Sequence, residues 1–133
     1  MNPKPTIMVI EDDADISDVL VMMLEASGYD TALASNGREG LDQLGKAEKL
    51  PDVILLDLMM PVMDGWEFRI AQMSDPALAH VPVVLVSAHV EVRSMAAKMA
   101  VAAWLRKPID FRELLKVLER LDAAALEPAR ARA

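Results

Sequence analysis

The chain contains no cysteine, which excludes disulfide bonds and thiol chemistry. No apolar run approaches the length of a membrane span. The opening residues, Met1 to Pro5, are not followed by the apolar segment of a secretory leader. Basic residues are outnumbered, 14 against 21 acidic ones, and the net charge of −7 disfavours direct binding to nucleic acid. We therefore expect a cytoplasmic protein that binds neither membranes nor nucleic acid directly.

The length and composition indicate one folded domain. With 133 residues, of which 53% are hydrophobic and 26% charged, the chain can build one hydrophobic core but is too short for two ordinary domains. After Asp122 the sequence becomes rich in alanine and arginine. We therefore expect a single domain over residues 1–122 and a C-terminal tail over residues 123–133.

Strand-like and helix-like segments alternate along the chain. Short β-rich runs bounded by turn signals predict strands at 6–10, 30–35, 53–57, 82–87 and 101–105. Apolar residues at helical spacing predict helices at 15–28, at 41–47 with an end near Pro51, and at 64–73, 90–99 and 110–122. This alternation implies an α/β protein whose parallel sheet has helices on both faces. For this size the commonest such arrangement is the flavodoxin-like fold, with five strands in the order 2-1-3-4-5.

One stretch, VILLDLMMPVMDG at residues 53–65, combines an uninterrupted apolar strand with a single acidic residue at its end. Such a run is typical of a strand buried on both faces of a sheet. Asp57 therefore lies where a central strand emerges, which is where open α/β sheets place their chemistry. Of all the polar residues in the chain, Asp57 is the strongest single candidate for a functional role.

Other polar residues also follow strands, and the fold would gather them beside Asp57. Asp12 and Asp13 follow the first strand, Ser87 ends the fourth, and Lys107 follows the fifth. Three carboxylates in one crevice repel one another unless a cation lies among them, and Mg²⁺ prefers such oxygen ligands. Lys107 and Ser87 are suited to holding phosphoryl oxygens, and Asp57 can act as a carboxylate nucleophile. The set fits in-line phosphoryl transfer.

Each of these residues alone also has an ordinary structural explanation. An aspartate pair between a strand and a helix commonly caps the helix, a serine at a strand end commonly makes a turn, and Lys-Pro commonly ends a strand. The specific signal is their joint occurrence, in order, at the ends of the expected strands.

With these motifs the chain resembles the receiver domain of two-component response regulators, the CheY-like receiver family, over residues 5–122. The resemblance rests on Glu11-Asp12-Asp13, on Asp57 and the loop after it, on Ser87-Ala88, and on Lys107-Pro108. It implies that Asp57 accepts a phosphoryl group from the phosphohistidine of a histidine kinase or a histidine phosphotransfer protein. Such a protein catalyses only its own phosphorylation and dephosphorylation, and is otherwise no enzyme.

The resemblance also implies a ligand set. Mg²⁺, with Mn²⁺ as the alternative ion, is expected on Asp13, Asp57 and the backbone carbonyl of Met59, and on Asp12 partly through water. Ser87 and Lys107 are expected to contact the phosphoryl group. The Lys107–Pro108 peptide bond is expected to be cis.

A switch residue is implied three positions before the lysine, at Trp104. In this family the Ser87 hydroxyl would move toward the phosphoryl group and the aromatic ring would turn inward behind it. The surface formed by helix 90–99, strand 101–105 and the last helix would then change its affinity for a downstream protein target. The alternative is that Trp104 is only a large, half-buried strand residue.

Two other functions are less consistent with the residues. A flavin-binding carrier would place the flavin phosphate beside Glu11, Asp12 and Asp13, which would repel it. A phosphohydrolase that forms an aspartyl phosphate would need an acid–base aspartate where this chain has Met59. Among receivers, a phosphorylation-independent form is disfavoured because every expected site residue is present. We expect a stand-alone receiver, with a receiver cut from a longer regulator or hybrid kinase as the alternative.

Overall fold

The computed structural model describes the backbone of residues 4–132 and the side chains of residues 4–122. Strands and helices alternate throughout this part of the chain. The strands are β1 (Thr6–Ile10), β2 (Asp30–Ala34), β3 (Val53–Asp57), β4 (Val83–Ser87) and β5 (Ala103–Arg106). The helices are α1 (Ala14–Ala26), α2 (Gly37–Lys46), α3 (Gly65–Met73), α4 (Val92–Met99) and α5 (Phe111–Arg132).

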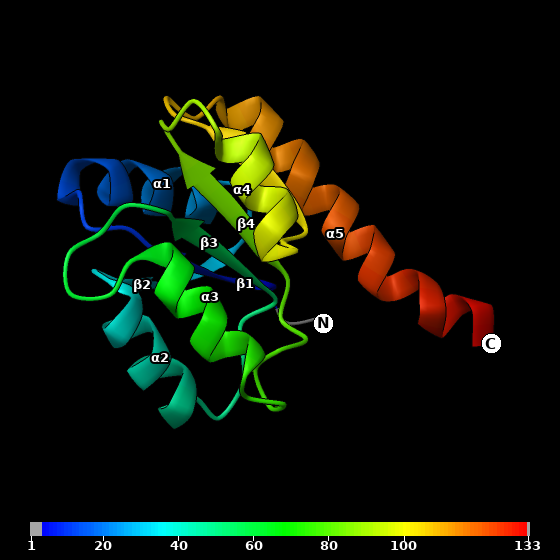
Figure 1. Cartoon of the computed structure of the whole chain (residues 1–133). Coiled ribbons are helices and arrows are strands. Elements are labelled where there is room, and N and C mark those ends of the chain that lie inside the picture. Colours follow the sequence, from blue (N-terminus) through cyan, green and yellow to red (C-terminus); the bar gives the residue numbers. More distant parts are fainter. Residues whose placement is uncertain (1–3, 133) are drawn as a thin grey trace.

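The strands form one parallel sheet in the order β2-β1-β3-β4-β5 (Figure 1), which confirms the predicted fold class and strand order. β3 occupies the centre, and all five of its residues are buried. Because every strand runs in the same direction, the residues that follow β1, β3, β4 and β5 meet at one edge of the sheet.

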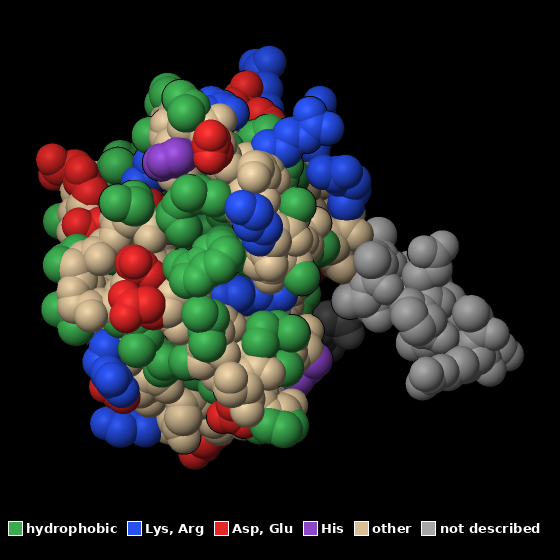
Figure 2. All heavy atoms as spheres, viewed as in Figure 1, with side chains coloured by type: hydrophobic (Ala, Val, Ile, Leu, Met, Phe, Trp, Pro, Cys, Tyr) green, Lys and Arg blue, Asp and Glu red, His purple; other side chains and the backbone are tan. Residues whose placement is uncertain are grey.

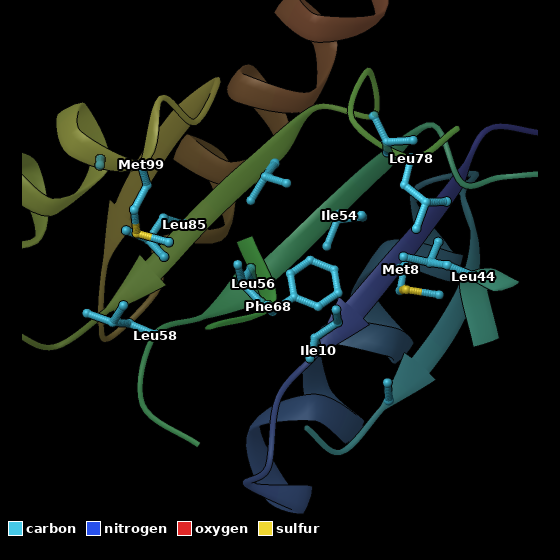
Figure 3. Close-up of a cluster of buried hydrophobic side chains, with 14 of the residues drawn as sticks. Met8, Ile10, Leu44, Ile54, Leu56, Leu58, Phe68, Leu78, Leu85 and Met99 are labelled. Atoms are coloured by element: carbon cyan, nitrogen blue, oxygen red, sulfur yellow. The ribbon is translucent and has the colours of Figure 1, made fainter. Parts of the chain in front are cut away.

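The side chains of each central strand alternate between two hydrophobic cores, one on each face of the sheet. Met8, Ile54 and Leu85 pack against α2, α3 and α4, with Phe68 of α3 near the middle of that core (Figure 3). Val9, Leu55 and Val86 face the other way and pack against α1 and α5. Helices therefore cover both faces, as the sequence predicts.

Several element boundaries differ from the predicted ones. α2 ends at Lys46, before the expected end near Pro51, and α4 begins at Val92, after the expected start at 90. α4 ends where Ala100 adopts a left-handed conformation, with φ 54°. The next residues then turn into β5, which starts at Ala103 and not at 101. The predicted tail at 123–133 lies outside the residues whose side chains are described.

A buried polar network fixes the C-terminal end of α4 against α3. The Arg69 guanidinium donates to the carbonyls of Met99 at 2.9 Å and Ala100 at 2.7 Å, and to the Gln72 side chain at 2.7 Å. A cation at the C-terminal end of a helix also interacts favourably with the helix dipole. Burial lowers the pKa of Arg69, but an arginine stays charged under all ordinary conditions.

The outer face of α3 carries hydrophobic side chains at the surface (Figure 2). On α3, Trp66, Ile70 and Met73 are between 39% and 57% exposed, whereas Phe68 is fully buried. In the described part of the chain, no helix has both the length and the apolar character that crossing a membrane requires.

Candidate functional site

The carboxyl edge of the sheet brings together residues that follow four of the strands. Asp57 ends β3 and Ser87 ends β4, and both residues are buried, at 5% and 1% exposure. In Figure 1 the arrowheads of β3 and β4 end on the same side of the molecule. The backbone amide of Lys107 donates to the Ser87 carbonyl at 3.0 Å, so the end of β5 is held beside the end of β4.

Lys107 forms ion pairs with two buried carboxylates. Its Nζ lies 2.7 Å from Oε1 of Glu11 and 3.3 Å from Oδ1 of Asp57. Lys107 and Asp57 are candidates from the sequence alone, whereas Glu11 has no predicted role. Glu11 continues the hydrogen bonding of β1, because its amide donates to the Ala34 carbonyl at 3.0 Å. The burial of Glu11 could have been predicted from the sequence. Side chains alternate between the two faces along β1, so Glu11 lies on the same face as the buried Val9.

The electrostatics of the site favour a cation. Burial, together with the neighbouring Glu11 carboxylate, raises the pKa of Asp57 to about 7, although Lys107 acts in the opposite direction. For Lys107, burial alone would lower the pKa, but the hydrogen bond to Glu11 and the charge of Asp57 leave the pKa raised. Lys107 therefore stays charged at neutral pH, yet it does not fully compensate the carboxylates around it.

Three carboxylates at this edge are close enough to share one metal ion. Oxygen atoms of Glu11, Asp12 and Asp57 all lie within 4.8 Å of one another. Carboxylate oxygens are the ligands that Mg²⁺ prefers, and Asp12 is exposed, so an ion could keep several waters. The residues present therefore fit a hard divalent cation such as Mg²⁺.

Asp13, expected as a metal ligand, lies outside this carboxylate group in the described part of the chain. Its Oδ1 accepts the amides of Asp15 at 3.0 Å and Ile16 at 3.2 Å, so Asp13 is the N-cap of α1. The chain turns into α1 directly after Asp12, and this turn directs the Asp13 carboxylate to the helix end. The structure thus brings Asp12 and Asp57 together, adds Glu11 to them, and gives Asp13 a capping role.

The remaining expected residues lie at the end of β4, in the loop after β3, within β5 and directly after β5. The Ser87 hydroxyl oxygen accepts the backbone amide of His89 at 3.0 Å. Met59, whose backbone carbonyl is an expected ligand, lies in the loop after β3 with a side chain that is 67% exposed. Trp104 lies on β5 opposite Leu85 of β4 and is 37% exposed. The Lys107–Pro108 peptide bond is cis, as expected.

The start of α3 lies unusually close to the backbone around Asp57. The Gly65 amide donates to the Leu58 carbonyl at 2.9 Å, and Asp64 and Glu67 form a reciprocal capping box at this helix end. A Cβ atom at Gly65 would lie 2.5 Å from the carbonyl oxygen of Asp57 and 2.9 Å from Cα of Leu58. Only glycine therefore allows the helix to pack against the strand end that carries Asp57.

Gly65→Ala should lower the free energy of unfolding by about 1–3 kcal/mol, because the new methyl group meets backbone atoms that cannot rotate away. Gly45→Ala is the matched control, since a Cβ there has nothing within 4 Å and alanine favours a helix. This control should raise the free energy of unfolding by about 0.5–1 kcal/mol. Urea unfolding of both variants measures the difference. Equal effects at the two positions would contradict the close approach at Gly65.

Comparisons with known proteins agree with this geometry. The family described as the response regulator receiver domain matches residues 7–119. The DNA-binding dual master transcriptional regulator RpaA of Synechocystis sp. is 34% identical over 113 residues, which cover 84% of this chain and 46% of RpaA. The chain spans about half the length of the curated relatives RpaA and MtrA.

Solved structures show the same fold. A sensor protein from Polaromonas sp. is 31% identical, with a TM-score of 0.81 over 91% of this chain and 98% of the other. The chemotaxis response regulator CheY4 of Vibrio cholerae is 29% identical, with a TM-score of 0.79 over 89% of this chain and 98% of the other. The fold, the strand-end residues and the family match agree. The chain therefore belongs to the response regulator receiver domain family, whose members act in two-component phosphorelay signalling.

Proposed function

We propose that Asp57 accepts a phosphoryl group from a phosphohistidine and that the modified protein docks onto a downstream protein target. The observation that carries this proposal is the position of Lys107, whose Nζ bridges Asp57 and Glu11 at the buried end of β3, beside Asp12. A nucleophilic carboxylate, a fixed cation and further carboxylates for a metal ion are together the parts that phosphoryl transfer requires.

In the proposed reaction an Oδ atom of Asp57 attacks the phosphorus atom of the phosphohistidine. The new O–P bond forms as the N–P bond breaks, and the donor imidazole leaves with the electron pair of that bond. Lys107 would place its positive charge on the transferred oxygens, and the Ser87 hydroxyl would donate a hydrogen bond to one of them. Attack by water on the acyl phosphate would later release inorganic phosphate and restore Asp57.

Mg²⁺, when bound, would neutralise the charge that develops on the phosphoryl oxygens. The groups proposed to hold it are the Asp12 and Asp57 carboxylates and the Met59 backbone carbonyl, with Glu11 nearby to interact through water. Asp13 is left out of this set because its carboxylate caps α1.

A phosphohistidine donor has an apolar surface available next to Lys107. A groove of about 320 Å³ runs between α1 and the segment after β5, and its apolar lining includes Ile16, Val19, Leu20 and Phe111. An apolar helix face on a histidine kinase or histidine phosphotransfer protein would fit this groove and bring its phosphohistidine to Asp57.

The downstream target is proposed to bind the surface formed by α4, β5 and α5. A groove of about 730 Å³ on this surface is lined by Trp104, Lys116, Val117 and Arg120, among others. A change in the position of Trp104 would alter its shape and so its affinity for a partner. The same docking would operate in a stand-alone receiver or in a receiver linked to an output domain. A linked output domain is considered because RpaA and MtrA, which are about twice as long as this chain, are named as DNA-binding regulators.

The test is the intact mass of the protein after incubation with acetyl phosphate, with Mg²⁺ or with EDTA, for the wild type and for Asp57→Asn. We expect the wild type to gain one phosphoryl group only when Mg²⁺ is present, and Asp57→Asn to gain none, because the amide is not a nucleophile. Hydroxylamine should remove the added mass, since it cleaves acyl phosphates.

Asp64→Asn is the matched control, because Asp64 lies in the loop after β3 and an asparagine can still cap α3. This variant should be phosphorylated as the wild type is. Phosphate uptake by Asp57→Asn, or a modification that resists hydroxylamine, would contradict the proposed phosphoacceptor.

A further inference from the structure

Arg106, the last residue of β5, connects three parts of the structure near the site. Its guanidinium donates to the carbonyl of His89 at 3.0 Å and, at a longer 3.5 Å, to that of Val90. The same group lies over the Trp104 ring, 5.9 Å from the ring centroid, within the range of a cation–π contact. One exposed side chain therefore joins the strand that carries Trp104 to the loop between β4 and α4.

This loop is in turn connected to Ser87. The His89 amide donates to the Ser87 hydroxyl oxygen at 3.0 Å. The His89 ring nitrogen Nδ1 accepts the Glu91 amide at 3.0 Å, and the His89 carbonyl accepts the Val92 amide at 3.2 Å. Glu91 gives α4 no side-chain cap of its own, so His89 takes that role. The conformation of residues 88–91 thus sets both the start of α4 and a hydrogen bond to the Ser87 hydroxyl.

The two ends of α4 are held by different arginines. Arg69, which is buried, fixes the C-terminal end through the Met99 and Ala100 carbonyls. At the other end Arg106 is exposed, and so are His89 and Val90, whose carbonyls it contacts. Exposed contacts of this kind open more readily than buried ones, so the N-terminal end of α4 and its loop are the part able to move.

We infer that Arg106 is a positioning residue that links Trp104 to residues 88–91, and through them to the Ser87 hydroxyl. This inference rests on the proposed function, because it assigns Ser87 a contact with the phosphoryl group. An inward turn of Trp104 would separate its ring from the Arg106 guanidinium, which the His89 carbonyl holds in place. A shift of the loop would likewise move the guanidinium and the ring. Either movement alone would break or stretch one of these contacts, so Arg106 favours movement of the loop and the ring together.

Arg106→Gln tests whether Arg106 links Trp104 to residues 88–91, and Arg93→Gln is the matched control. Arg93 is exposed on α4 and makes no hydrogen bond or ion pair through its side chain within the described residues, so its substitution removes the same charge without the contacts. Both substitutions are made in a Trp66→Phe background, in which Trp104 is the one remaining tryptophan. Hydrogen exchange of residues 89–92 and acrylamide quenching of Trp104 are measured without any phosphoryl donor.

In the Arg106 variant we expect the amides of residues 89–92 to exchange about tenfold faster, the size of effect that the loss of one charge-assisted hydrogen bond produces. Quenching of Trp104 should change as well, and the Arg93 variant should match its parent in both measurements. The inference would be overturned if the Arg106 variant had the same exchange rates and the same quenching as its parent.

Acetyl phosphate and Mg²⁺ are then added, and mass and Trp104 emission are followed together. We expect the Arg106 variant to gain one phosphoryl group, while its change in Trp104 emission falls to less than half that of the parent. An undiminished change in emission would overturn the inference. If the parent gains no mass, the proposed function fails, but the exchange and quenching measurements still decide whether Arg106 fastens the loop.

Discussion

Asp12→Asn should weaken Mg²⁺ binding by about 100-fold or more, whereas Asp13→Asn should leave it almost unchanged. Loss of a group that merely orients a metal ligand reduces affinity by about 10–100-fold, and loss of a charged ligand is at least as severe. Asp12 shares the carboxylate cluster with Glu11 and Asp57, and Asp13 does not. Calorimetric titration with Mg²⁺ measures both variants against the wild type.

The Asp13 variant is a fair control because asparagine also caps helices well. The two amide hydrogen bonds that Asp13 accepts at the start of α1 can therefore remain, and only the charge is lost. The same pair of variants distinguishes the ligand set expected from the family resemblance, which includes Asp13, from the set that the geometry supports. A large loss of Mg²⁺ affinity in Asp13→Asn, with little loss in Asp12→Asn, would contradict the geometry.

Asp57→Asn should raise the free energy of unfolding of the metal-free protein by about 4 kcal/mol at pH 8. The pKa of Asp57 is raised from 3.8 to about 7, so ionising this carboxyl in the folded protein is unfavourable. The amide in the variant carries no charge and can donate a hydrogen bond to Glu11. Lys107 keeps its ion pair with Glu11 at 2.7 Å, so the substitution leaves no isolated charge behind. Urea unfolding in EDTA measures the effect.

The pH dependence of this difference has a definite sign. A carboxyl whose pKa is higher in the folded than in the unfolded chain binds more protons when folded, so acid stabilises the fold through this group. The destabilisation by Asp57 is fully present above pH 7 and disappears as the pH falls from about 7 toward 3.8. The advantage of Asp57→Asn should therefore shrink steadily over this range.

Asp42→Asn, at an exposed position on α2, provides the control and should change stability by less than about 0.5 kcal/mol. Addition of Mg²⁺ should stabilise the wild type more than the Asp57 variant, because the ion binds a folded site that includes the carboxylate. If the Asp57 variant were less stable than the wild type at pH 8 in EDTA, ionisation of the Asp57 carboxyl could not be as unfavourable as its raised pKa implies.

Sequence by itself determined the fold and most of the residues at the candidate site. Alternating strands and helices of this length leave few arrangements of a parallel sheet, and the uninterrupted apolar run before Asp57 predicted the central strand. Parallel strands end at a common edge, so Asp57, Ser87 and Lys107 could be grouped without coordinates. Their chemistry then suggested phosphoryl transfer, and the family match agrees with that class of function.

Only the tertiary structure decided which acidic residues face the site. Glu11, Asp12 and Asp13 are neighbours in sequence, but their side chains have different surroundings. Glu11 pairs with Lys107, Asp12 is exposed beside Asp57, and Asp13 caps α1. Side-chain direction after a strand depends on where the backbone turns into the helix, and residue spacing does not specify that turn. The contacts of Arg106 have the same origin, because its guanidinium binds carbonyls 16 and 17 residues earlier in the chain, on a different element.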